Sequence, residues 1–297
     1  MFVRRSVSRN RRRKVVAWAI AFATVVALLA LSIWALIERV AAEEETQRAM
    51  LSLFEGLSLN MHQGQPGSLC VYGLCDGAPP GDGSENWRSL GRLPDAVNAV
   101  DGRPTSRVFA ASRKFGWGGV IVYAQDALTL DDEITEDSDN LLFAQNALAW
   151  LTPLNFESGC PEKVTILAWE GTFAQTARMQ QVREFVERRG WALKATGPDA
   201  LEDDLKCAGV LWYLSDWQPP PEFADVDVPL IEEFVQRGGG LLVGGLGWSY
   251  AQQGGPDRGA ATAPYAADVL GKPFGFAFTK DAFESRGDTP ITLQSGK

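Results

Sequence analysis

The sequence predicts a three-layer α/β domain with a largely parallel sheet, preceded by an N-terminal transmembrane helix. Two observations support this prediction. An unbroken apolar run covers residues 15–37, directly after a strongly basic N-terminus, and in the second half of the chain short apolar strands alternate with helical segments. Alternating strands and helices are typical of βαβ units, whose helices cover both faces of a parallel sheet.

The apolar run spans twenty-three residues, which at about 1.5 Å per residue crosses a hydrocarbon core of about 30 Å. Basic residues stay on the cytoplasmic side, so residues 1–14 are expected inside and everything from Glu38 onward outside the plasma (inner) membrane. A cleaved signal peptide is the alternative, because residues 40–42 form a small-residue cleavage site. Secretory apolar regions usually span only about 7 to 15 residues, so an uncleaved, single-pass signal anchor is predicted.

Charge is divided unevenly along the chain. The formal net charge is −9, but residues 1–14 carry seven positive charges and no acid, so the remainder carries −16. An outer domain this acidic repels nucleic acid and anionic lipid head groups. The partners expected are the membrane, through the N-terminal helix, and a glycan or an envelope protein, with no nucleic acid.

Four cysteines follow the apolar run, where an oxidising compartment would pair them. Cys70 and Cys75 bracket a short loop that contains a glycine, so a local bridge is predicted, which leaves Cys160 for Cys207. Four cysteines permit three connectivities, and the sequence does not choose among them. A zinc site would need paired C-x-x-C spacing, which is absent, so no metal is predicted.

Residues 38–103 are predicted to form a juxtamembrane stalk and a loop-rich segment, because helical spacing up to residue 58 gives way to closely spaced prolines and glycines. The α/β domain is expected over residues 104–297. It begins with a hairpin of two short β-type runs, residues 107–111 and 119–123. An acidic loop follows, and Asp139 at its end is expected to cap a helix.

The acidic loop, residues 126–139, lacks the EF-hand pattern, so a solvated loop is favoured over a calcium site. The remaining elements are expected in alternation: helices over residues 140–151, 172–189 and 229–237, and strands over residues 163–169, 191–195, 208–214 and 240–244. No lysine followed by serine or threonine comes after the glycines that end the last strand, so no nucleotide cofactor is predicted.

The segment Phe234-Val235-Gln236-Arg237-Gly238-Gly239-Gly240-Leu241-Leu242-Val243-Gly244-Gly245-Leu246-Gly247-Trp248 resembles a helix, Gly-rich turn and strand unit of class I glutamine-amidotransferase-like domains. The resemblance is to the type found in TRP-channel-associated factors and in enhancin-like peptidases. Residues 119–126, 139–140 and 146–151 resemble the strand-and-helix unit of the same domains. The resemblance covers roughly residue 104 to the C-terminus and implies a flavodoxin-like, amidotransferase-like fold.

Active members of that class use a cysteine nucleophile on a strand-to-helix elbow and a histidine base. The sequence has one histidine, His62, in the loop-rich segment, and no G-x-C-x-G elbow. His62 is expected to be a surface loop residue, so Cys–His and Ser–His–Asp chemistry lack their base, and one histidine is too few for an H-E-x-x-H site. No catalytic residue is assigned, and an inactive fold is favoured over an enzyme.

A ligand site is predicted at the carboxyl edge of the sheet, where open parallel sheets bind ligands. Aromatic faces beside carboxylates suit sugar rings, glycines would remove bulk from one wall, and Trp169 and Tyr250 are expected nearby. The candidate residues follow three strands: Glu170 and Thr172; Asp216 and Trp217; Gly245, Gly247 and Trp248.

The function expected is therefore a membrane-anchored, extracytoplasmic ligand-binding or scaffolding module, with carbohydrate as a candidate ligand. Two alternatives stay open. Glu170 and Asp216 could act as the carboxylate pair of a glycan hydrolase, or the domain could serve as an accessory subunit of an envelope complex.

Overall fold

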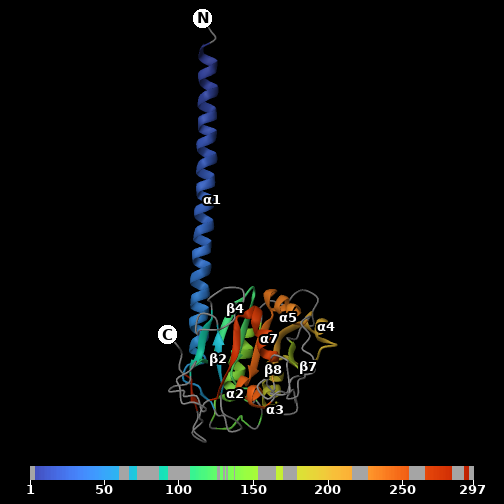
Figure 1. Ribbon diagram of the computed structural model, residues 1–297. Helices are drawn as coiled ribbons and strands as arrows, with labels where there is room; N and C mark the ends of the chain where they lie inside the picture. The colour runs from blue at the N-terminus through green and yellow to red at the C-terminus, as the bar shows by residue number, and fades with distance from the viewer. Residues whose placement is uncertain are drawn as a thin grey trace. The chain divides into compact units, whose positions relative to one another are not determined.

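In the computed structural model the chain divides into two compact units, Met1–Leu51 and Ser52–Lys297 (Figure 1). Each unit is described by itself. The structure describes residues 4–59, 67–71, 87–92, 108–125, 128–129, 131, 133–136, 138–152, 165–169, 179–215, 227–253, 265–282 and 291–293.

A single long helix, α1 (Arg4–Ser52), accounts for the first unit. The described apolar side chains of residues 15–37, such as Trp18 and Trp34, are exposed. Within the described part of the chain, no helix combines the length and apolar character that a membrane crossing requires. The transmembrane anchor stays a prediction.

The second unit is built on one mixed sheet with the strand order β10-β2-β4-β5-β9-β8-β6-β7, in which β3 also pairs with β4. The five strands from β5 to β7 in this order run parallel to their neighbours, whereas β10, β2, β4 and β3 pair antiparallel. The strands are β2 (Gly67–Val71), β3 (Arg88–Arg92), β4 (Val108–Phe115), β5 (Gly118–Tyr123), β6 (Thr165–Trp169), β7 (Ala192–Thr196), β8 (Ala208–Ser215), β9 (Gly240–Gly245) and β10 (Phe276–Ala282).

The predicted hairpin is confirmed as β4 and β5. Phe115 pairs with Gly118, so Gly116 and Trp117 form a two-residue turn. Gly116 has a φ of 59°, a left-handed conformation that favours glycine in such tight turns. The hairpin is longer than predicted because β4 runs on to Phe115.

Helices cover both faces of the sheet, as expected for three layers. Successive residues of a strand point to opposite faces. A Cβ on Gly118 would clash with the backbone carbonyl of Val235, whereas one on Gly119 would lie 2.7 Å from the Trp150 ring. The two helices on opposite faces are therefore α5 (Asp227–Gln236) and α2 (Asn140–Leu151).

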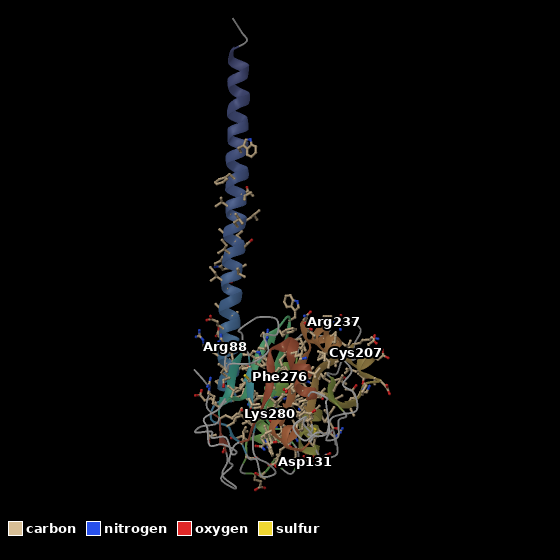
Figure 2. The ribbon with its side chains drawn as sticks, viewed as in Figure 1. Arg88, Asp131, Cys207, Arg237, Phe276 and Lys280 are labelled. Atoms are coloured by element: carbon tan, nitrogen blue, oxygen red, sulfur yellow. The ribbon has the colours of Figure 1, made fainter. Side chains whose placement is uncertain are left out.

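The other helices are α3 (Gln180–Arg188), α4 (Leu201–Leu205), α6 (Gly247–Gln253) and α7 (Ala266–Phe274). Because α3 and α5 connect parallel strands, they run back from the carboxyl edge of the sheet, where the parallel strands end, to the amino edge, where they begin. Figure 2 shows Arg237, just beyond the end of α5, and Asp131, beside the start of α3, at opposite ends of the domain.

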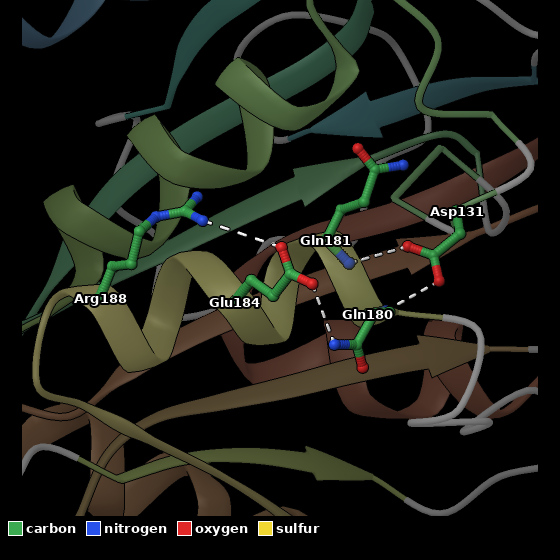
Figure 3. A network of polar contacts seen from close by, with 5 residues as sticks. All are labelled: Asp131, Gln180, Gln181, Glu184 and Arg188. Atoms are coloured by element: carbon green, nitrogen blue, oxygen red, sulfur yellow. Dashed lines mark hydrogen bonds and ion pairs between the residues drawn. The ribbon is translucent and has the colours of Figure 1, made fainter.

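Two acidic residues of the loop predicted to be solvated have specific partners. Asp131 accepts hydrogen bonds from the backbone N–H groups of Gln180 and Gln181, at 2.8 and 2.9 Å, and so caps α3 (Figure 3). Asp139 stands before α2 but makes no side-chain cap there. Its Oδ2 instead accepts a hydrogen bond from the N–H of Ser58 at 2.8 Å. Asp139 thus occupies the N-cap position of α2, as predicted, but its side chain does not make the capping hydrogen bond.

The folded domain starts earlier in the chain than the sequence suggested. Strands β2 and β3 lie within residues 38–103, which were predicted as stalk and loops, and both join the main sheet. Two further short strands, β1 (Ser58–Leu59) and β11 (Ile291–Thr292), pair with each other. The second compact unit accordingly begins at Ser52 and not near residue 104.

Cys70, on β2, and Cys207, just before β8, are both disulfide-bonded. These two strands stand four places apart in the sheet, which corresponds to about 19 Å at the usual strand spacing. Disulfides join Cα atoms no more than about 7 Å apart, so Cys70 and Cys207 are not bonded to each other. Cys75 and Cys160 lie outside the described residues, and the pairing Cys70–Cys75 with Cys160–Cys207 stays a prediction.

Candidate functional site

The carboxyl edge of the parallel sheet brings together the strand ends from which the predicted site extends. In order across the sheet, β9 ends at Gly245, β8 at Ser215 and β6 at Trp169, and Ser215 pairs with Gly245. Four of the predicted site residues follow β6 or β8 in the sequence and lie outside the described residues: Glu170, Thr172, Asp216 and Trp217. The third loop, which follows β9, is described in full.

Gly245 and Gly247 are buried against other parts of the protein. A Cβ on Gly245 would lie 2.5 Å from the Tyr265 hydroxyl, and one on Gly247 would lie 2.5 Å from the backbone oxygen of Thr279. These glycines allow α6 and β9 to pack tightly against β10 and the start of α7. The space beside them is occupied by protein, so they do not open one wall of a site as the sequence suggested.

Tyr265, the residue before α7, holds the turn after β9 in place. Its buried hydroxyl accepts a hydrogen bond from the N–H of Leu246 at 2.9 Å. Its ring lies 4.9 Å from the ring of Tyr250 and meets the ring of Phe278 edge-on at 5.7 Å. The residues that link β9 to α6 are therefore fixed by aromatic packing and one buried hydrogen bond.

A partly buried carboxyl group sits beside these rings. Asp268, in the first turn of α7, accepts a hydrogen bond from the N–H of Phe278 at 2.8 Å. Burial raises the pKa of Asp268 to about 6, against the lowering effect of that hydrogen bond. Burial also raises the pKa of Tyr250, and the charge of Asp268 adds to the rise. We call Tyr250, Tyr265, Asp268 and Phe278 the aromatic–carboxylate cluster.

Trp248 keeps part of its surface exposed, as does Asp268, whereas both tyrosines are buried. Trp248 lies over β2, since its Cδ1 atom would be 3.4 Å from a Cβ on Gly67. Within the described part of this edge, Trp248 and Asp268 are thus the site residues that a ligand could touch. Trp248 was predicted here from the sequence.

Three members of the aromatic–carboxylate cluster were not predicted from the sequence. Tyr265 precedes α7, Asp268 lies on α7 and Phe278 lies on β10, and no element was predicted beyond residue 244. A signal was present: Gly275, with φ of 80°, ends α7 and separates an amphipathic helix from a strand of alternating aromatic residues. Among the residues that the structure describes, no three His, Cys, Asp or Glu side chains gather to hold a metal ion.

No protein-family model and no curated protein matches the chain. Three solved structures resemble it: the IMPa metallopeptidase of Pseudomonas aeruginosa, with a TM-score of 0.44 and 11% identity; IMPa metallopeptidase in complex with T-antigen, at 0.43 and 12%; and IMPa from P. aeruginosa in complex with an O-glycopeptide, at 0.40 and 13%. The matches cover 84%, 82% and 84% of this chain, which spans about a quarter of the length of those structures, 24% in each case. A likeness at this level carries no argument about function, and the amidotransferase-like resemblance stays a prediction.

Proposed function

We propose that this chain is a membrane-anchored, extracytoplasmic binding module that takes a hydroxyl-rich ligand, such as a glycan, at the carboxyl edge of its sheet. The observation that carries this proposal is the position of Asp268. Its carboxyl group stands beside aromatic rings at the end of the parallel strand β9, where open α/β sheets bind ligands.

The chemistry of the cluster suits such a ligand. A carboxyl group with a pKa of about 6 accepts hydrogen bonds when ionised and also donates one when protonated. Trp248, partly exposed at the same edge, offers a flat apolar face of the kind that stacks on sugar rings. Together they match a ligand that presents both hydroxyl groups and C–H faces.

Two observations support the anchored, extracytoplasmic location. Disulfides persist in oxidising compartments, and both Cys70 and Cys207 are disulfide-bonded. The apolar run of residues 15–37 follows seven basic residues, which favours a cytoplasmic N-terminus. Protease added outside intact cells should digest the domain; survival there, with cleavage only after lysis, would contradict this orientation.

The proposal assigns no catalytic activity to the chain, and the reason comes from the sequence. The one histidine in the sequence, His62, lies outside the described residues. The second candidate function is a carboxylate-dependent hydrolase. One observation favours the hydrolase: β6 and β8 are neighbouring parallel strands. The loops that carry Glu170 and Asp216 therefore start from adjacent strand ends. Glycan turnover by the wild type that disappears in Glu170→Gln would establish this alternative.

Binding can be tested with the full-length chain in lipid nanodiscs and a glycan library, read out by isothermal titration calorimetry. Loss of one anchoring aromatic residue commonly costs about 2 kcal/mol or more, so Trp248→Ala should weaken binding at least about tenfold. Trp117→Ala, at the opposite edge of the sheet, is the matched control and should bind as the wild type does. Equal affinity of both variants would overturn the proposed site. A specific protein neighbour in membrane crosslinking, without glycan binding, would favour an accessory subunit.

A further inference from the structure

Asp268 has one carboxylate oxygen that the protein leaves to solvent. Its Oδ1 atom accepts the hydrogen bond from the N–H of Phe278 at 2.8 Å. Within the described part of the chain, Asp268 forms no further hydrogen bond and no ion pair. Its side chain is partly exposed, and Oδ2 is not one of the fully buried atoms that lack a partner. Oδ2 is therefore the oxygen that a ligand can reach.

The same carboxylate has no positive charge beside it, among the residues that the structure describes. Lys272, one turn further along α7, and Lys280, on β10, are both exposed, and neither forms an ion pair with Asp268. Burial raises the pKa of Asp268 to about 6, opposed by the hydrogen bond from the neutral N–H of Phe278. At neutral pH the group is thus ionised, partly buried and uncompensated. Burying a charge in this way costs free energy, which a bound cation would recover.

Aromatic side chains lie close to this carboxylate. The charge of Asp268 contributes to the raised pKa of Tyr250, so the phenol stands within electrostatic range of the carboxylate. A Cβ on Gly247 would lie 2.8 Å from the Cβ of Phe278, whose N–H binds Asp268. The partly exposed Trp248 follows Gly247 directly. Aromatic faces carry partial negative charge and attract cations, so the rings and the carboxylate favour the same kind of ligand.

We propose that the candidate site binds an amino sugar whose ammonium group pairs with Oδ2 of Asp268 beside the rings of the aromatic–carboxylate cluster. Amino-sugar binding presupposes the glycan binding proposed above and names the class of sugar. An ammonium group brings three hydrogen-bond donors and a full positive charge. A sugar hydroxyl would satisfy the hydrogen bonding of Oδ2 but would leave its charge uncompensated.

The charge of the chain favours the same ligand. Everything after residue 14 carries a formal charge of −16. A field of this sign attracts cations and repels sugars that carry carboxylate or sulfate groups. Such attraction raises the local concentration of a cationic sugar but does not place it at one site. A test of the pairing must therefore separate Asp268 from the other acidic residues.

Isothermal titration calorimetry on the full-length chain can compare the hexamers of glucosamine and of N-acetylglucosamine. The chain is held in nanodiscs of phosphatidylcholine, whose zero net charge does not attract the amines. The two ligands have the same length and ring, and differ in an ammonium or a neutral acetamido group on each ring. Near a pH of about 6.5, Asp268 is largely ionised and the amines are largely protonated. The wild type should bind the glucosamine hexamer at least about tenfold more tightly.

Two variants locate the source of this preference. Asp268→Asn removes the charge but keeps an acceptor oxygen for the N–H of Phe278, and should reduce the preference to about threefold or less. Glu202→Gln is the matched control. Glu202 is exposed on α4, which follows β7 at the far edge of the sheet from β10. Its substitution removes the same charge away from the site and should leave the preference of the wild type in place.

The outcomes separate amino-sugar binding from glycan binding in general. If the wild type binds both hexamers equally, or binds only neutral glycans of the library, the pairing with Asp268 is overturned and the glycan-binding function stands. If Asp268→Asn and Glu202→Gln change the preference equally, the attraction is diffuse and the pairing is overturned as well. If neither hexamer nor any other glycan binds, the proposed function fails together with the pairing.

Discussion

Ser58 and Asp139, 81 residues apart in the sequence, exchange two hydrogen bonds of 2.8 Å each. The N–H of Ser58 donates to the Asp139 carboxylate, and the N–H of Asp139 donates to the backbone oxygen of Ser58. These bonds join the first segment of the domain to the loop before α2. They also place that segment beside α2, where the rings of Phe54 and Phe143 lie 5.3 Å apart.

Asp139→Ala should lower the free energy of unfolding by about 1 to 2 kcal/mol, because the Ser58 N–H loses its acceptor in a partly buried position. Asp139→Asn keeps an acceptor oxygen and should cost less. Glu136→Ala, an exposed residue of the same loop, is the control and should change little. Urea unfolding followed by circular dichroism measures all three, and equal stability of Asp139→Ala and Glu136→Ala would contradict the prediction.

Asp131→Ala should destabilise α3, because it removes the acceptor for the backbone N–H groups of Gln180 and Gln181. Loss of an N-cap typically costs about 1 kcal/mol. Hydrogen exchange should show faster exchange of these two amides, with little change in β7. The acidic loop, which the sequence predicted to be solvated, thus contains a residue that stabilises a helix. Unchanged protection of both amides would show that the cap does not hold in solution.

Asp268 should make stability depend on pH. Its folded pKa, raised by burial to about 6, exceeds the ordinary value of 3.8, so the folded state holds the proton more tightly than the unfolded chain. The contribution of Asp268 to the free energy of unfolding is then most favourable below pH 3.8 and weakens as pH rises to about 6. Asp268→Asn should therefore gain stability relative to the wild type above about pH 6, and much less near pH 4.

Asp204 provides a control in which the pKa shift has the opposite sign. Burial alone would raise its pKa, but hydrogen bonding and the charge of the Lys194 ammonium hold the pKa below the ordinary 3.8. Its stabilising contribution is present above that value and is lost as the pH falls. Asp204→Asn should thus lose stability at neutral pH. Thermal unfolding at several pH values distinguishes Asp268→Asn from Asp204→Asn. If the stabilities of the two variants depend on pH in the same way, the opposite pKa shifts of Asp268 and Asp204 are refuted.

Gly247→Ala should destabilise the turn after β9 by about 1 to 3 kcal/mol, since the new Cβ would press on the backbone oxygen of Thr279. Gly197→Ala is the control, because a Cβ there would meet no atom within 4 Å. If Gly247→Ala unfolds at the same urea concentration as Gly197→Ala, the packing of α6 against β10 is looser than described.

Peptide mapping without reduction should find Cys70 joined to Cys75 and Cys160 joined to Cys207. The spacing of β2 and β8 already rules out a bond between Cys70 and Cys207. The informative alternative is therefore Cys70 with Cys160 and Cys75 with Cys207, and finding those peptides would overturn the prediction.

Much of the parallel half of the sheet could be predicted from the sequence. Buried parallel strands are short apolar runs, and the helices between them show regular spacing, so β6 to β9 with α2 and α5 follow from local patterns. The antiparallel half could not be predicted. Strand β2, Gly-Ser-Leu-Cys-Val, has a short apolar end, and β3, Arg-Ser-Leu-Gly-Arg, has one apolar side chain, so neither was predicted as a strand. Both are strands because of their pairing, β2 with β10 and β4, and β3 with β4.

The candidate site, like the fold, could be predicted from the sequence only in part. The sequence by itself determined which edge of the sheet to examine, because the strand predicted over residues 240–244 ends there, and it indicated Trp248. Only the tertiary structure decided what lies beside them. Tyr265, Asp268 and Phe278 come from elements after β9 in the chain, and the raised pKa of Asp268 arises from burial against that packing. Desolvation depends on which atoms surround a group in space, and no local pattern of residues encodes it.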